Sequence, residues 1–283
     1  MTVLISYLFY FVAASASPLQ RRWLASKKNA DNTGQIHFAF QVTSVTVLLS
    51  LSLPFFQPFR FEGSPLTLTL LTALAGMFGA GFFVSSFTAQ KHVEAGVSTL
   101  VNNIYTPVTI VLASLFLSEH LTRMQVLGTV LLFVGMVVVS KKHRIGTFRF
   151  DKYFLLMVLS GITLGISLTA ERALQKMTGF SAGTMLSWWA QCAFLGIAAF
   201  LTKEKSPYSK KDISITGSLR FLQSLSWVVL LFAVGNLSLV SAVTTFKVVI
   251  IFVFAAIFLN EREDLTRKII GSLVSVAGLL LMR

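Results

Sequence analysis

The chain has 283 residues, of which 54% are hydrophobic and only 12% are charged, and its formal net charge is +13. Soluble globular proteins carry roughly 25% charged residues, so this composition argues against a soluble enzyme and indicates that lipid is the solvent. The basic residues lie in short breaks between apolar segments rather than on one stripe, which is typical of membrane proteins and argues against nucleic-acid binding.

Ten apolar segments follow one another along the chain, and a helix needs about 20 residues to cross the hydrocarbon core. No basic residue precedes the first segment, so we expect an uncleaved span there rather than a signal peptide. The segments are too uniformly apolar for barrel strands, which alternate with a period of two residues. The sequence therefore predicts an all-α membrane protein with ten transmembrane helices, at 2–19, 35–56, 66–90, 95–117, 124–140, 153–170, 181–201, 215–234, 238–259 and 268–282.

The two halves of the chain repeat a motif. Leu-Ser-Glu at 117–119 and Leu-Asn-Glu at 259–261 are each followed by Leu-Thr-Arg and then by two glycines seven residues apart. Each half holds five spans, an odd number, so the second half must enter the membrane inverted relative to the first. Inverted repeats are typical of secondary transporters, which bind their substrate near the midplane between the halves. The repeated glycines are Gly128 and Gly135 in the first half and Gly271 and Gly278 in the second.

Two long segments resemble the repeat of the EamA family, in the drug/metabolite transporter superfamily: AQKHVEAGVSTLVNNIYTPVTIVLASLFLSEHLTRMQVLGTVLLFVGMVVV and VGNLSLVSAVTTFKVVIIFVFAAIFLNEREDLTRKIIGSLVSVAGLLLM. The resemblance covers nearly the whole chain. It implies two EamA-like five-helix repeats, 1–141 and 152–283, around a central cavity that works by alternating access. Members of the family transport amino acids, other metabolites, cations, nucleotide sugars or drugs. The second repeat departs from the first because Pro107 has no counterpart near Val249.

The orientation of the chain in the membrane stays open. Most basic residues between the spans fall in the odd-numbered connections, so the positive-inside rule places those connections in the cytoplasm and both termini outside. The family resemblance implies the opposite orientation, with both termini inside. In either orientation we expect a multi-pass protein of the cell (inner) membrane, acting as a monomer or a homodimer on a small-molecule substrate.

Lys247 lies ten residues into the ninth predicted span, close to the middle of the hydrocarbon core at about 1.5 Å per residue. Burying an ammonium group there is costly, so such a residue usually faces a cavity and binds something. We interpret Lys247 as the site for a substrate carboxylate or phosphate, or as a proton-coupled switch. A lysine that only pairs with a neighbouring helix is the structural alternative.

Polar stripes on other spans predict the rest of the substrate site. The stripe on the fourth span includes Pro107, which removes a backbone donor, frees a carbonyl group and predicts a hinge. Interhelical hydrogen bonding is the alternative explanation for such stripes. With Lys247, the predicted substrate-binding residues are Ser98, Asn102, Tyr105, Thr106, Thr244, Trp188, Gln191 and Ser167.

Two other features of the spans are interpreted as structural. Glu171 and Arg172 fall at the end of the sixth predicted span, where a solvated pair is favoured over a coupling site. Glycine runs at 76–81 and at Gly161 and Gly165 predict close contacts between helices.

The sequence favours a secondary transporter of a small metabolite, with an amino acid or another carboxylate-bearing solute as the exported cargo. It contains no HExxH, CxxC or Walker motif, so we expect no metal, no cofactor and no direct use of ATP. Two alternatives stay open. One is an exporter of cationic drugs, and the other is an integral-membrane enzyme acting on a lipid-linked substrate, which needs convergent acid–base or metal groups.

Overall fold

The computed structural model describes residues 2–27, 34–55, 57, 59–117, 122–140, 152–203, 205–234, 247–260 and 264–281. Within these ranges the chain is helical and contains no strand, which confirms the all-α prediction. A helix satisfies its own backbone polar groups, as a chain surrounded by lipid requires. The helices are α1 (Thr2–Lys27), α2 (Gln35–Ser50), η1 (Leu53–Phe55), α3 (Pro65–Ala89), α4 (Ala95–Asn102), α5 (Tyr105–Leu117), α6 (Arg123–Ser140), α7 (Lys152–Thr178), α8 (Phe180–Thr202), α9 (Lys210–Val234), α11 (Lys247–Phe258) and α12 (Leu265–Leu281).

Large apolar side chains face outward on many of these helices. Leu115, Ile197 and Phe200, for example, are all exposed. Soluble proteins rarely expose so much contiguous apolar surface, whereas lipid contact accounts for it. Five stretches of the described chain are long and apolar enough to cross a membrane: Gln35–Phe55, Pro65–Ala89, Ala95–Leu112, Lys152–Thr178 and Phe180–Thr202.

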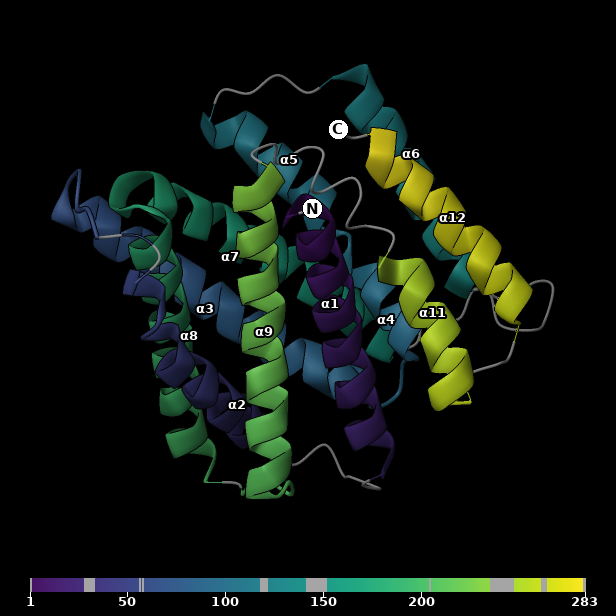
Figure 1. The fold of residues 1–283 in the computed structure, drawn as a ribbon, viewed down its shortest axis with the longest axis horizontal. Coiled ribbons are helices and arrows are strands. Elements are labelled where there is room, and N and C mark those ends of the chain that lie inside the picture. The colour runs from purple at the N-terminus through teal and green to yellow at the C-terminus, as the bar shows by residue number, and fades with distance from the viewer. Residues whose placement is uncertain are drawn as a thin grey trace.

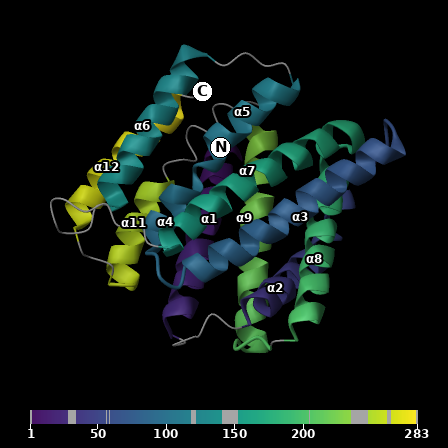
Figure 2. The same ribbon diagram turned by 180° about the vertical axis from the view of Figure 1, so that it is seen from behind.

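The more polar helices lie in the middle of the molecule. α1 and α9 pack side by side at its centre, and α6 and α12 pack together at one edge (Figure 1). Seen from behind, α3 and α7 cross the central pair at a slant (Figure 2). α1 buries Ser6, Ser15 and Ser17, which belong in a protein interior rather than against lipid.

Small residues join α6 to α12. A Cβ atom at Gly135 would overlap Ser275 Oγ and the carbonyl oxygen of Gly271. A Cβ atom at Gly278 would lie 2.5 Å from the carbonyl oxygen of Gly128. The glycines that repeat in the sequence therefore meet in a crossed pattern, in which Gly135 lies against Gly271 and Gly278 lies against Gly128.

The fourth predicted span is not one continuous helix. α4 ends at Asn102 and α5 begins at Tyr105, with Asn103 and Ile104 between them in a turn whose N–H groups bond three residues back. Pro107 accounts for the break, because a proline ring inside a helix clashes with the carbonyl group four residues earlier, here that of Asn103. The prediction of a single helix over 95–117 was wrong, because Asn103 and Ile104 separate α4 from α5.

Three helices extend further than their apolar cores indicated. α1 continues past residue 19 to Lys27, α7 continues past residue 170 to Thr178, and α9 begins at Lys210 rather than at 215. Helices continue through polar residues wherever hydrogen bonds and neighbouring helices support them, so hydropathy alone places their ends too early. Of the ninth predicted span, 238–259, only residues 247–259 are described, so Thr244 lies outside the described residues.

The glycine prediction is confirmed at α7. A Cβ atom at Gly165 would lie 2.7 Å from Val108 of α5, and one at Gly161 would overlap the side chain of Ile104. Both glycines therefore allow the α4–α5 segment to lie directly on α7.

Candidate functional site

Polar side chains around the α4–α5 break are hydrogen-bonded to neighbouring helices. Asn102 Oδ1 accepts a hydrogen bond of 2.6 Å from Ser160 Oγ of α7. Ser98, fully buried, meets Gln90 at the end of α3, where Gln90 Nε2 lies 3.2 Å from Ser98 Oγ. The backbone N–H of Thr106 bonds the carbonyl of Asn103 and closes the turn. These contacts hold the break in place.

Lys247 reaches α1 from the start of α11. Its Nζ donates a hydrogen bond of 3.1 Å to the Tyr10 hydroxyl and lies 5.8 Å from the centroid of that ring. Tyr10 is buried and packs 5.6 Å, between ring centroids, from Trp227 of α9. Tyr7, one turn earlier on α1, has a buried hydroxyl without a hydrogen-bond partner. We call Lys247, Tyr7, Tyr10 and Trp227 the lysine centre.

The lysine centre contains no described acidic partner. The ion pairs of the described chain are Arg267 with Asp264 and Lys268 with Glu94, and neither involves Lys247. A tyrosine hydroxyl is a neutral acceptor, so it leaves the charge of the ammonium group uncompensated. Within the described part of the molecule, this residue has the character expected of an anion-binding lysine.

Gln191 and Ser167 converge from α8 and α7 on the backbone of Gly79 in α3. A Cβ atom at Gly79 would lie 2.8 Å from Gln191 Nε2 and 3.0 Å from Ser167 Oγ. Ser167 Oγ donates a hydrogen bond of 2.8 Å to the carbonyl oxygen of Ala75. Trp188, by contrast, packs edge-on against Phe221 in an apolar cluster. The structure therefore brings Gln191 and Ser167 together and places Trp188 in packing.

Arg220 of α9 is the partner of Gln191. Its Nη2 donates a hydrogen bond of 3.0 Å to Gln191 Oε1, and its Cζ lies 3.3 Å from the centroid of the Phe83 ring. Arg21 of α1 lies close by, with its Cζ 5.4 Å from the centroid of Phe87. We call Arg21, Arg220, Phe83, Phe87 and Gln191 the arginine centre.

Sequence reasoning missed both arginines. Lys247 was noticed because it is a charged residue within an apolar segment. Arg220 lies inside the eighth predicted span, so the same rule identifies Arg220 equally well. Arg21 was counted with a polar connection because the first apolar run ends at residue 19, whereas α1 continues to Lys27. Arg21 lies within the bundle because α1 continues as a helix beyond the end of its apolar run.

The interpretation of Glu171 as part of a solvated pair was wrong. Its Oε2 accepts a hydrogen bond of 2.9 Å from Ser187 of α8, and its Oε1 accepts one of 3.3 Å from Gln175. Because α7 continues to Thr178, Glu171 lies within the helix rather than at its end. The charge of this carboxylate acts on Arg220, which makes Glu171 a neighbour of the arginine centre.

The first half of the chain matches a known family. Residues 4–141 match the profile of the EamA-like transporter family, which supports the resemblance of the repeats. The family indicates a membrane transporter of the drug/metabolite transporter superfamily, as the resemblance of the repeats predicts.

The whole fold also occurs in a solved structure. A chain titled "Crystal structure of protein" matches this one with a TM-score of 0.56 over 99% of this chain and 95% of its own length. The two are 13% identical in sequence, so the likeness extends to the fold alone. No curated protein matches the sequence.

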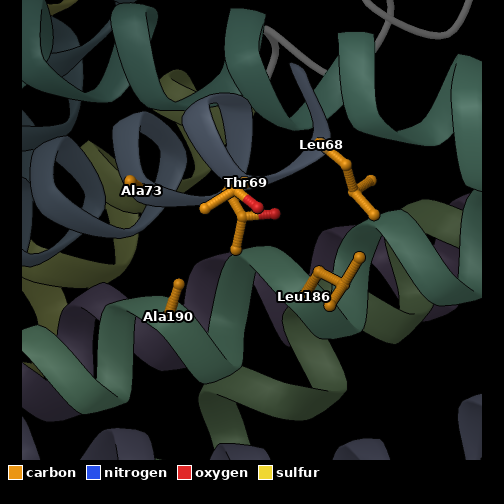
Figure 3. A pocket seen from close by; sticks show the side chains of 6 residues that line it. Leu68, Thr69, Ala73, Leu186 and Ala190 are labelled. Carbon is orange, nitrogen blue, oxygen red and sulfur yellow. The ribbon is translucent and has the colours of Figure 1, made fainter. Parts of the chain in front are cut away.

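An apolar pocket of about 320 Å³ lies between α3 and α8. Leu68 and Leu186 point toward each other across it, and Ala190 lies below Thr69 (Figure 3). None of the lining side chains is charged, and the Thr69 hydroxyl donates to the carbonyl of Pro65 in its own helix. The pocket therefore lacks the convergent polar groups that a polar solute needs.

Proposed function

We propose that this protein is a secondary transporter that carries a small carboxylate-bearing metabolite across the cell membrane by alternating access. The observation that carries the proposal is the ammonium group of Lys247, which Tyr10 holds between α1 and α11 and which has no acidic partner among the described residues. An intramembrane cation without an acidic partner fits a solute that supplies the negative charge itself.

The pairing of helices supports an arrangement of two inverted five-helix repeats, 1–141 and 152–283. If α1, α3 and α6 correspond to α7, α9 and α12, then α1 packing on α9 corresponds to α3 packing on α7. The α6–α12 contact then joins two equivalent helices. Such exchange symmetry is what inverted repeats produce, and alternating access follows when one repeat rocks against the other.

The break between α4 and α5 supports the same mechanism. Interrupted helices inside a membrane protein are tolerated where they line a cavity, and transporters use them at their substrate sites. In the repeat alignment Tyr105, the first residue of α5, corresponds to Lys247, the first described residue of α11. We propose that Ser98, Asn102, Tyr105 and Thr106 lie along the substrate path beside Lys247, with Pro107 as the hinge.

The test is a flux assay in proteoliposomes that contain the purified full-length protein. Radiolabelled amino acids, monocarboxylates and a quaternary ammonium compound would be offered to wild type, Lys247→Ala and Lys247→Arg. We expect carboxylate flux in wild type, a loss of at least tenfold in Lys247→Ala, and partial rescue in Lys247→Arg. Lys203→Ala, which changes an exposed lysine, is the control.

Flux of the quaternary ammonium compound that survives Lys247→Ala, together with no carboxylate flux, would support the cationic-drug alternative and refute the proposal. Equal carboxylate flux in wild type and Lys247→Ala would instead remove Lys247 from the substrate site.

A further inference from the structure

Arg21 and Arg220 approach α3 from two different helices, and each guanidinium group lies against a phenylalanine ring. The rings belong to Phe83 and Phe87, one helical turn apart, with centroids 5.2 Å from each other. Arg220 stacks on the first ring and Arg21 on the second. The two positive groups therefore share one aromatic wall.

Most of the donors on these two side chains have no protein acceptor. A guanidinium group has five N–H donors. Among the described residues, the single hydrogen bond of the pair runs from Arg220 Nη2 to Gln191 Oε1. Arg21 Nε and Arg220 Nη1 are buried without any partner. Buried donors left in this way are destabilising, so the arrangement favours a ligand that accepts from them.

The charges near the pair do not cancel. Arg21 repels Arg220, and Glu171 attracts it. The Glu171 carboxylate already accepts hydrogen bonds from Ser187 and Gln175. Within the described part of the chain, one carboxylate beside two guanidinium groups leaves one positive charge uncompensated in a low-dielectric interior, where charges are normally paired.

We propose that Arg21 and Arg220 form an oxyanion-binding site that takes a carboxylate or phosphate group with one net negative charge. The Phe83 and Phe87 rings hold the planar faces of both guanidinium groups and leave N–H donors at their edges without a protein acceptor. Guanidinium groups pair well with the oxygens of a carboxylate or phosphate group. Gln191 orients Arg220, and Glu171 limits the site to a single negative charge. The inference rests on the proposed function, because the anion it would bind is the transported solute, and it adds a second cationic site to Lys247.

A binding experiment tests this site without any need for transport. The full-length protein would be purified in an uncharged detergent and unfolded by heat at constant ionic strength. Sodium benzoate, sodium phosphate and a short-chain phosphatidylglycerol would be titrated in turn, because a solute and a lipid headgroup present the same chemistry. Binding to the folded state raises the unfolding midpoint in a saturable way. We expect benzoate or phosphate to do so.

Four variants connect the binding to these residues. Arg21→Gln and Arg220→Gln should each weaken the apparent Kd at least tenfold. Arg60→Gln, which changes an exposed arginine, should leave it unchanged. Glu171→Gln should tighten it at least threefold, since the site then carries two uncompensated positive charges. The tighter binding of Glu171→Gln tests the proposed site even if an arginine variant fails to fold.

Equal apparent Kd values in wild type, Arg21→Gln, Arg220→Gln and Glu171→Gln would overturn the proposal, as would the absence of any saturable shift in wild type. A shift with the lipid alone would assign the site to a headgroup and overturn it for solutes. Anion binding that depends on both arginines, without flux in proteoliposomes, would refute the proposed transport while leaving the site in place.

Discussion

Among the helix pairs that join the first half of the chain to the second, α6–α12 and α1–α9 are built in opposite ways. α6 and α12 meet through glycine and serine at backbone distance, and Ser275 Oγ donates to the Leu132 carbonyl. α1 and α9 meet through polar and aromatic groups. For example, Gln20 Nε2 donates a hydrogen bond of 3.0 Å to Thr216 Oγ1. The α1–α9 pair also carries the two arginines with buried, unpartnered donors.

The contrast separates stability from binding. Close backbone contact gains dispersion energy and is disrupted by an added methyl group, so the α6–α12 pair contributes to the stability of the contact between the halves. Buried donors without an acceptor do not stabilise the fold by themselves, and we propose that the α1–α9 pair retains them for a ligand. Four substitutions test this division, in decreasing order of their expected effect on stability.

Gly135→Ala should destabilise the protein by roughly 2–3 kcal/mol, because the new Cβ atom would overlap Ser275 Oγ and the Gly271 carbonyl oxygen. The measurement is unfolding in mixed micelles of increasing SDS content. Gly81→Ala is the matched control, since the nearest atom to its Cβ would be Thr163 Cγ2 at 3.8 Å. Equal stability of the two variants would show that α6–α12 contact does not hold the halves together.

Ser187→Ala should cost about 1.5–2 kcal/mol, because it removes a hydrogen bond of 2.9 Å to the Glu171 carboxylate. The same SDS unfolding measures it. Ser52→Ala is the control, since its exposed hydroxyl bonds only the Leu49 carbonyl nearby in sequence. An unchanged free energy of unfolding for Ser187→Ala would instead support the interpretation of Glu171 as a solvated residue.

Phe83→Leu should cost about 1 kcal/mol more than Phe82→Leu, because only Phe83 lies under the Arg220 guanidinium. Phe83 is buried and Phe82 is only partly buried, so a double-mutant cycle of Phe83→Leu with Arg220→Met separates the cation–π contact from the difference in burial. Phe83→Leu should also weaken anion binding, because the Arg220 guanidinium group loses the ring on which it lies. A difference near zero in both measurements would contradict the role given to the aromatic wall.

Arg220→Met should change the free energy of unfolding by no more than about 1 kcal/mol while abolishing anion binding. Removal of an uncompensated buried charge offsets the loss of the bond to Gln191. SDS unfolding and the benzoate titration together measure the two effects. A loss of more than about 3 kcal/mol would make Arg220 a structural residue and remove the contrast between the two helix pairs.

The sequence by itself determined the chemistry of the fold. Apolar segments long enough for the bilayer, with so few charges, specify membrane helices because nothing else satisfies backbone groups in lipid. The repeated glycines and Pro107 were also recognisable from the sequence, because the absence of a side chain or of a backbone N–H group acts through local geometry. Lys247 was found because a charge within a long apolar run is visible without any structure.

The tertiary structure decided which polar groups meet. Hydropathy ends α1 at residue 19 and the sixth span at residue 170, but packing extends both helices and brings Arg21 and Glu171 into the bundle. Trp188 and Gln191 share a face of one helix, yet one meets an apolar cluster and the other an arginine, because different neighbours lie against each turn. Periodicity gives the face of a helix, and only the arrangement of the other helices says what that face touches.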